Sequence, residues 1–268
     1  MRILLTGASG FVGGALLRAY PGLIPSPSLR GLSEDGVRRI VEESGADAVI
    51  HTAAISDISV CEKRPEDSFQ ANVLLPEYLA RACGPRKLIC FSSDQVYGGS
   101  DGPGPYSEGM EKPANVYAVH KLEMENRVLA LSPDAVLLRA EWMYDWPGTR
   151  PNYLLNILRA EGSVAFSSRQ YRGVTWLREV AEVLPAVLNL PGGVYNFGCE
   201  TDLSMMEITR EFVRFLGRPL IVEDAPSRHS LWMDCSKAAE RAVRFSSALD
   251  GLKRCAAENR LTGLPEAL

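Results

Sequence analysis

Short apolar runs alternate with stretches of helical periodicity along the first half of the chain, and this alternation restricts the possible folds most. Runs that are apolar along their whole length are typical of parallel strands buried on both faces. Consecutive strands joined by a helix pair in parallel through right-handed crossovers. The pattern therefore predicts an α/β fold built on a parallel sheet. The apolar runs are residues 3–5, 47–51, 87–91 and 136–138, and the helical stretches are residues 11–20, 34–44, 65–83 and 114–131.

The second half of the chain is less regular, although its composition is that of an ordinary globular protein. The 268 residues suffice for one large domain or two small ones, and 46% hydrophobic with 23% charged residues exclude wholesale disorder. Helices are expected at residues 152–160, 176–189, 204–216 and 236–257, and further strands at 22–24, 164–166, 194–197 and 220–223.

The charge and the cysteine content exclude several classes of function. Lysine and arginine total 29 against 33 acidic residues, and the net charge of −4 argues against nucleic-acid binding. The six cysteines include no C-x-x-C pair and the three histidines are scattered, so no metal site is expected. The first apolar run is too short for a signal peptide, and no run is long enough to cross a membrane. We therefore expect a cytoplasmic protein with reduced thiols and with neither nucleic-acid nor membrane partners.

A glycine-rich turn separates the first apolar run from the first helix. Gly7, Gly10 and Gly13 follow one another at intervals of three residues, in the pattern G-x-x-G-x-x-G. Gly7 allows a tight turn, Gly10 lets a pyrophosphate approach the backbone, and Gly13 allows close packing of the helix on the strand. The free N–H groups at the start of the helix favour bound phosphate. A turn of this kind after an N-terminal strand predicts a dinucleotide-binding site.

The residue expected to read the cofactor ribose is basic. In NAD-binding sites, an acidic residue about 20 positions beyond the glycine-rich turn binds the ribose 2′-hydroxyl. No acidic residue occurs between residues 14 and 30, and Arg30 follows the second expected strand. An arginine at this place can pair with the 2′-phosphate of NADP. NADP is therefore slightly favoured as the cofactor, and NAD stays an alternative.

Tyr117 and Lys121 form a candidate acid/base pair. They lie four residues apart in a helical stretch, so both side chains are on one face of the helix. Ser93 follows the apolar run 87–91, at the kind of strand end where the active sites of open α/β sheets gather. Tyr117 would act as an acid toward a carbonyl or as a base toward an alcohol, with Ser93 bonded to the same oxygen.

The charge of Lys121 is expected to lower the pKa of the Tyr117 phenol. A free tyrosine has a pKa near 10, and lowering it by about 2–3 pH units needs roughly 3–4 kcal/mol. One ammonium group at about 4 Å supplies up to roughly 4 kcal/mol at the effective dielectric constant near a protein surface. Lys121, helped by the positive charge of an oxidised nicotinamide, would therefore be sufficient.

Six or seven short motifs, in order along residues 1–240, resemble the extended short-chain dehydrogenase/reductase family. Within that family the chain is similar to the sugar-nucleotide reductases of the dTDP-4-dehydrorhamnose reductase-like group. Each motif is modest alone, and their common order makes the resemblance specific. The motifs are residues 6–13, 51–54, 61–66 with 72–73, 91–97, 113–121, 138–144 and 228–231.

The resemblance implies a doubly wound, Rossmann-like sheet with a smaller C-terminal substrate-binding region. The dinucleotide-binding domain would comprise residues 1–141 and 172–195, and the substrate-binding region residues 142–171 and 196–268. The implied catalytic residues are Ser93, Tyr117 and Lys121. The residues expected to bind the cofactor are Gly7, Gly10, Phe11, Val12, Gly13, Arg30, Ala54, Ile55, Ser56, Tyr117 and Lys121. The residues expected to contact substrate are Asp94, Trp142 and His229.

The resemblance implies an NAD(P)H-dependent reductase of a nucleotide-linked 4-keto-6-deoxysugar. Hydride would pass to C4 of the sugar while Tyr117 donates the proton. Two alternatives stay open: a sugar-nucleotide epimerase that returns the hydride, and a non-catalytic NADP-binding regulatory subunit. A dehydratase is disfavoured because Asp94-Gln95 does not match the Asp-Glu pair of such enzymes. The sequence also leaves open whether the protein forms a homodimer.

Overall fold

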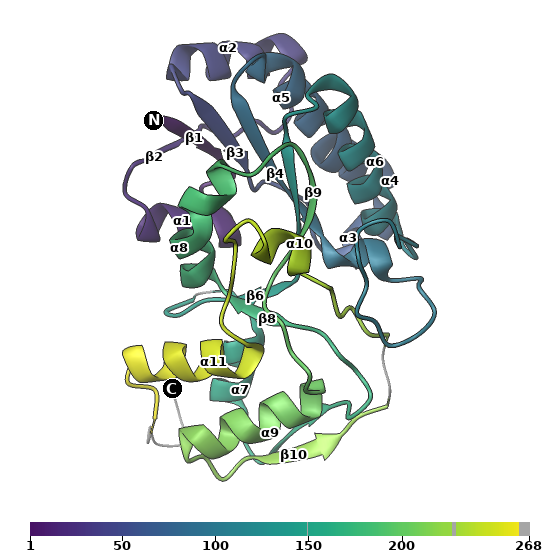
Figure 1. Ribbon diagram of the computed structural model, residues 1–268, viewed down its shortest axis with the longest axis vertical. Helices are drawn as coiled ribbons and strands as arrows, with labels where there is room; N and C mark the ends of the chain where they lie inside the picture. The colour runs from purple at the N-terminus through teal and green to yellow at the C-terminus, as the bar shows by residue number, and fades with distance from the viewer. Residues whose placement is uncertain (149, 227–228, 263–268) are drawn as a thin grey trace.

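A six-stranded sheet, parallel throughout, forms the larger part of the computed structural model, which describes residues 1–148, 150–226 and 229–262 (Figure 1). The strand order is β2-β1-β3-β4-β5-β9. Successive strands step away from β1 in both directions, so the doubly wound sheet implied by the sequence is confirmed. The strands are β1 (Ile3–Thr6), β2 (Leu23–Pro25), β3 (Ala48–His51), β4 (Lys87–Ser93), β5 (Val136–Ala140) and β9 (Gly193–Phe197).

Helices cover both faces of this sheet and bury a separate apolar core on each. One core lies between the sheet and α1 and α8, and the other lies between the sheet and α2, α5 and α6 (Figure 1). Burial on both faces explains why the strands are almost entirely apolar. The helices of this part are α1 (Phe11–Ala19), α2 (Glu34–Ser44), α3 (Ile58–Lys63), α4 (Pro65–Phe69), α5 (Leu75–Cys83), α6 (Val116–Leu131) and α8 (Leu177–Leu188), with a π-helical turn η1 (Gln70–Leu74) and a 3-10 turn η2 (Asp94–Tyr97).

The smaller part of the molecule has its own apolar core, built around two short strand pairs. β6 (Trp142–Tyr144) pairs with β8 (Val174–Trp176), and β7 (Ser163–Phe166) pairs with β10 (Ile221–Asp224), both in parallel. Helices α7, α9 and α11 pack together beneath the sheet in Figure 1. Their bounds are α7 (Tyr153–Arg159), α9 (Met205–Leu216) and α11 (Ala248–Glu258).

The observed pairing differs from the expected division of the chain at two places. The expected boundary puts residues 172–176 with the large sheet, whereas β8 pairs with β6. β9 continues to Phe197 and pairs with β5 over its whole length, beyond the expected boundary at residue 195. The division itself stays a prediction.

The helix expected at residues 236–257 is wrong, because the chain forms two helices there. α10 spans Ser236–Ala239, and α11 begins only at Ala248. Between them Ala242 has a left-handed backbone, with φ of 64°. The break lets Val243 and Phe245 turn into the core under the large sheet, where the Phe245 ring meets Phe197 at 5.0 Å between centroids.

A buried carboxyl group, that of Glu141, joins the two parts of the molecule between β5 and β6. One of its oxygens accepts hydrogen bonds from the Thr175 hydroxyl and from the backbone N–H of Cys199, the latter at 2.9 Å. A Cβ at Gly173 or Gly198 would lie 2.1 or 2.3 Å from this side chain, so a larger residue at either position would displace the Glu141 carboxyl group. Burial raises the pKa of Glu141 to about 7.

We expect Glu141→Gln to remove a pH dependence of stability. Because the folded-state pKa lies above the usual 4.5, this group's contribution is fully present below about pH 4.5 and is lost as the pH rises to about 7. Between pH 5 and pH 8 the wild type should therefore lose about 2–3 kcal/mol of unfolding free energy relative to Glu141→Gln. Urea unfolding at several pH values measures this difference. The exposed control Glu43→Gln should follow the wild type, and a Glu141→Gln curve parallel to the wild type would contradict the prediction.

Candidate active site

A cavity of about 1600 Å³ lies at the carboxyl ends of β1, β3, β4 and β5. Parallel strands place their carboxyl ends at one edge of the sheet, and open α/β folds bind their ligands there. The cavity runs from Ser26 and Arg30, beyond β2, to Trp142 and Arg172 in the smaller part. Its length suits an extended ligand that spans both parts of the molecule.

The glycine-rich turn lines one side of the cavity. Gly7 has φ of 77°, and its carbonyl accepts a hydrogen bond from the Gly10 N–H at 2.8 Å. A Cβ at Gly13 would lie 2.3 Å from the Gly7 carbonyl oxygen, so α1 packs against the turn only because residue 13 is glycine. Gly13 itself is not among the residues that line the cavity. The predicted packing role of Gly13 fits this geometry.

The start of α1 suits a phosphate group. Gly10 precedes the helix and supplies no side-chain hydrogen bond to its first N–H groups. Phe11 and Val12, the first two helical residues, line the cavity together with Gly7 and Gly10. Free backbone donors and the positive end of the helix dipole favour an anion at this point. The turn therefore fits the pyrophosphate of a dinucleotide.

Two further predicted segments lie along the same wall. Ala54, Ile55 and Ser56 line the cavity after β3, and Asn72 fixes this segment through both its amide atoms. The Asn72 Oδ1 accepts from the Ile55 N–H at 3.0 Å, and its Nδ2 donates to the Ile55 carbonyl at 2.9 Å. Arg30 lines the far end with an exposed side chain. The cavity thus brings together the predicted cofactor-binding residues other than Gly13.

Ser93, Tyr117 and Lys121 meet at the end of β4. Asn115 caps the start of α6, accepting a hydrogen bond from the Ala118 N–H at 2.8 Å, and this places Tyr117 in the first turn. Lys121 is fully buried and its Nζ donates to the Phe91 carbonyl at 2.7 Å. The same Nζ lies 5.9 Å from the centre of the Tyr117 ring. The three side chains predicted to be catalytic therefore share one corner of the cavity.

The expected effect of Lys121 on Tyr117 is wrong for this arrangement of side chains. Burial raises the pKa of the Tyr117 phenol, the neighbouring Ser93 hydroxyl opposes this, and the nearby Asp94 charge raises the pKa further. Lys121 directs its ammonium to the Phe91 carbonyl rather than to the phenol. Burial also lowers the pKa of Lys121, to about 8. Tyr117 consequently holds its proton at neutral pH.

The three predicted substrate residues are separated in the structure. Asp94 and Trp142 line the cavity on the side of the smaller part. His229 is not among the described lining residues. Its ring stacks on Tyr106 and lies 3.0 Å, through Nε2, from the Tyr97 carbonyl. Its contact with substrate stays a prediction.

Arg172 is a lining residue that sequence reasoning missed. It precedes β8 and forms an ion pair with Asp94, with 2.6 Å between Nη2 and the carboxylate. It lies in an irregular segment that also holds Arg169, so no periodicity or motif marks it in the sequence. Only the pairing of β6 with β8 places it beside the corner that holds the predicted catalytic residues.

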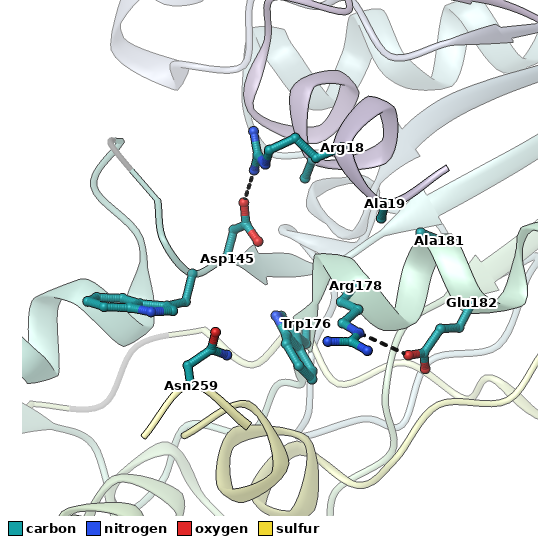
Figure 2. A pocket seen from close by; sticks show the side chains of 10 residues that line it. Arg18, Ala19, Asp145, Trp176, Arg178, Ala181, Glu182 and Asn259 are labelled. Atoms are coloured by element: carbon teal, nitrogen blue, oxygen red, sulfur yellow. Dashed lines mark hydrogen bonds and ion pairs between the residues drawn. The ribbon is translucent and has the colours of Figure 1, made fainter. Parts of the chain in front are cut away.

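A second, smaller cavity of about 390 Å³ lies between α1 and α8 and holds none of the predicted site residues (Figure 2). Its charged side chains are already paired: Arg18 with Asp145, and Arg178 with Glu182.

Among the described residues, no cluster of histidine, cysteine, aspartate and glutamate could hold a metal ion. Within the same residues, no helix combines the length and apolarity needed to span a membrane.

Comparison with known proteins places the chain in a family. A dTDP-4-dehydrorhamnose reductase from Mycolicibacterium smegmatis is 37% identical over 152 residues, 53% of this chain and 46% of that one. The reductase of that name from Mycobacterium tuberculosis (strain CDC 1551 / Oshkosh) is 32% identical over 200 residues, 69% of this chain. The match thus spans about half of the length of the first relative, 46%, and about two thirds of the length of the second, 65%.

The fold agrees with a solved structure of a protein that carries the same name as these relatives. The crystal structure of dTDP-4-dehydrorhamnose reductase from Bacillus anthracis in complex with NADP superposes with a TM-score of 0.85. It is 20% identical, and the match covers 96% of this chain and 99% of that one. The family described as "RmlD substrate binding domain" matches residues 1–230. The resemblance seen in the sequence is therefore confirmed: the chain belongs to the RmlD substrate binding domain family and has the extended short-chain dehydrogenase/reductase fold.

Proposed function

We propose that the protein is an NAD(P)H-dependent reductase of a nucleotide-linked 4-keto-6-deoxysugar. The observation that carries this proposal is the meeting of Ser93, Tyr117 and Lys121 in one cavity with a glycine-rich phosphate cradle. The names of the relatives from the two mycobacterial species support the same substrate class.

The cavity residues can hold a nicotinamide dinucleotide along the sheet edge. Gly7, Gly10 and the first N–H groups of α1 would bind the pyrophosphate, and Arg30 would face the ribose. Ala54 and Ile55 would support the nucleotide from the β3 side. The nicotinamide, when bound, supplies the hydride for carbonyl reduction.

Tyr117 supplies the proton in this proposal. The raised pKa of its phenol keeps the hydroxyl protonated at neutral pH, as a proton donor requires. The Ser93 hydroxyl would donate a hydrogen bond to the same carbonyl oxygen, where negative charge develops as hydride adds to the carbon. The carbonyl gains one hydride and one proton and becomes an alcohol. The buried Lys121 ammonium keeps α6, and with it Tyr117, against the end of β4.

Tyr117→Phe is expected to abolish proton donation while leaving the cofactor site intact. Reduction of a dTDP-linked 4-keto-6-deoxysugar, followed by NADPH absorbance, should fall by about 10²–10⁴-fold. NADPH affinity, measured by fluorescence titration, should change little, because the cradle is formed by other residues. The control Tyr195→Phe removes a hydroxyl bonded to the Pro191 carbonyl, away from the cavity, and should keep full turnover. Wild-type turnover in Tyr117→Phe would show that another group donates the proton.

Arg30→Ala is expected to lower the affinity for NADPH but not for NADH. The guanidinium is exposed at the end of the cavity, where it can reach the 2′-phosphate that only NADPH carries. We expect the dissociation constant for NADPH to rise about 10-fold and the dissociation constant for NADH to stay unchanged. Arg38→Ala, on the exposed side of α2 beside Asp35, is the matched control. Equal losses for both cofactors, or none, would remove Arg30 from the phosphate site.

A further inference from the structure

The Asp94 carboxylate lies between the catalytic serine and an arginine from the smaller part of the molecule. Its Oδ1 accepts a hydrogen bond from the Ser93 hydroxyl at 3.2 Å. Its Oδ2 accepts one from Arg172 Nη2 at 2.6 Å. Tyr117 lies beside the same serine, so Asp94 and Tyr117 flank the Ser93 hydroxyl.

Arg172 is held in place from two sides. Its guanidinium lies 5.2 Å from the centre of the Trp142 ring, and β6, which carries Trp142, pairs with β8, which begins two residues after Arg172. The side chain of Arg172 is 14% exposed and that of Asp94 is 4% exposed. Among the described residues, Arg172 forms the one ion pair of Asp94. An ion pair this far from solvent is screened little by salt or water.

The groups that surround Asp94 and Tyr117 show why the Asp94–Arg172 ion pair matters for the proposed reaction. Asp94 faces Arg172 and, farther off, Glu141 on the β5 side, whereas Tyr117 faces Ser93, Asp94 and the thiol of Cys61. Lys121 directs its ammonium to the Phe91 carbonyl. Without Arg172, Asp94 would be a buried carboxylate with Ser93 as its remaining side-chain donor. An unpaired buried carboxylate binds an available hydroxyl strongly.

We propose that Arg172 is a positioning residue for the proposed reduction: by pairing with Asp94, it weakens the hold of this carboxylate on the Ser93 hydroxyl, so that the hydroxyl can turn to the substrate carbonyl. The inference rests on the proposed function and assigns a role to a side chain outside the serine, tyrosine and lysine set. Arg172 acts through Asp94, and its contribution should disappear when Asp94 carries no charge.

A double-mutant cycle tests this coupling. Arg172→Met should lower kcat with the 4-keto-6-deoxysugar by about 10- to 100-fold at pH 8, because the Ser93 hydroxyl is lost to the substrate oxygen. The loss should be smaller at pH 6, where protonation of the unpaired Asp94 removes its charge. In the Asp94→Asn background, the same Arg172→Met change should alter kcat less than about 3-fold at either pH. KM for the sugar should differ little between the wild type and Arg172→Met, both of which carry Asp94.

Two further variants guard against loss of the fold. Arg172→Lys keeps a cation beside Asp94 and should retain most of kcat. Arg178→Met is the matched control, because Arg178 also lies over an indole, that of Trp176 at 5.6 Å, and pairs with Glu182, but outside the catalytic cavity (Figure 2). Should Arg172→Met not fold, Arg172→Gln takes its place in the cycle, since it keeps a polar side chain at this position but has no positive charge to pair with Asp94.

The outcomes separate this inference from the proposed function. A wild type that consumes no NADPH with the keto sugar overturns the proposed function, and the role of Arg172 with it. A wild type that turns over, with an Arg172→Met variant of wild-type kcat at both pH values, overturns only the inference. A loss that persists unchanged in the Asp94→Asn background, or that appears in KM, would show that Arg172 acts on the substrate directly and would equally overturn it.

Discussion

The buried hydrogen bond from Lys121 to the Phe91 carbonyl fixes the geometry on which the candidate site depends. An ammonium group away from water is costly unless it has a partner, so α6 can pack on β4 only where this bond forms. Tyr117 lies one helical turn before Lys121, and Ser93 lies two residues beyond Phe91. One bond between a helix and a strand therefore sets the relation of all three predicted catalytic side chains. Loss of this hydrogen bond would shift Tyr117 relative to Ser93 without altering either side chain chemically.

The two parts of the molecule contribute different functions to the cavity. The large sheet supplies the glycine-rich turn with Gly7 and Gly10 and the corner with the predicted catalytic residues, all at the carboxyl ends of its strands. The smaller part supplies Trp142 and Arg172 through the short β6–β8 pair. In the proposed function, the sheet thus carries the general chemistry of carbonyl reduction. Differences in substrate would then arise from the few side chains that the smaller part brings to the same corner.

Local pattern in the sequence predicted the elements that have strong local signals. The apolar strands, the helix at residues 34–44 and the glycine-rich turn all follow from neighbouring residues. The break after α10 does not, because Val243 and Phe245 leave the helix to reach a core assembled from distant strands. Arg172 has no local signal either, since its partner Asp94 lies 78 residues away. The direction of the Tyr117 pKa depends on burial, which the four-residue spacing to Lys121 cannot show.

The central claim is that hydride passes from the cofactor to the sugar and stays there. The most direct measurement uses NADPH with deuterium at both C4 positions, a dTDP-linked 4-keto-6-deoxysugar and the wild-type protein, with the product examined by proton and deuterium NMR. The account predicts one deuterium at C4 of the reduced sugar for each NADPH oxidised. A sugar that is epimerised with no net oxidation of NADPH, or one that is left unchanged while the cofactor stays bound and reduced, would contradict it.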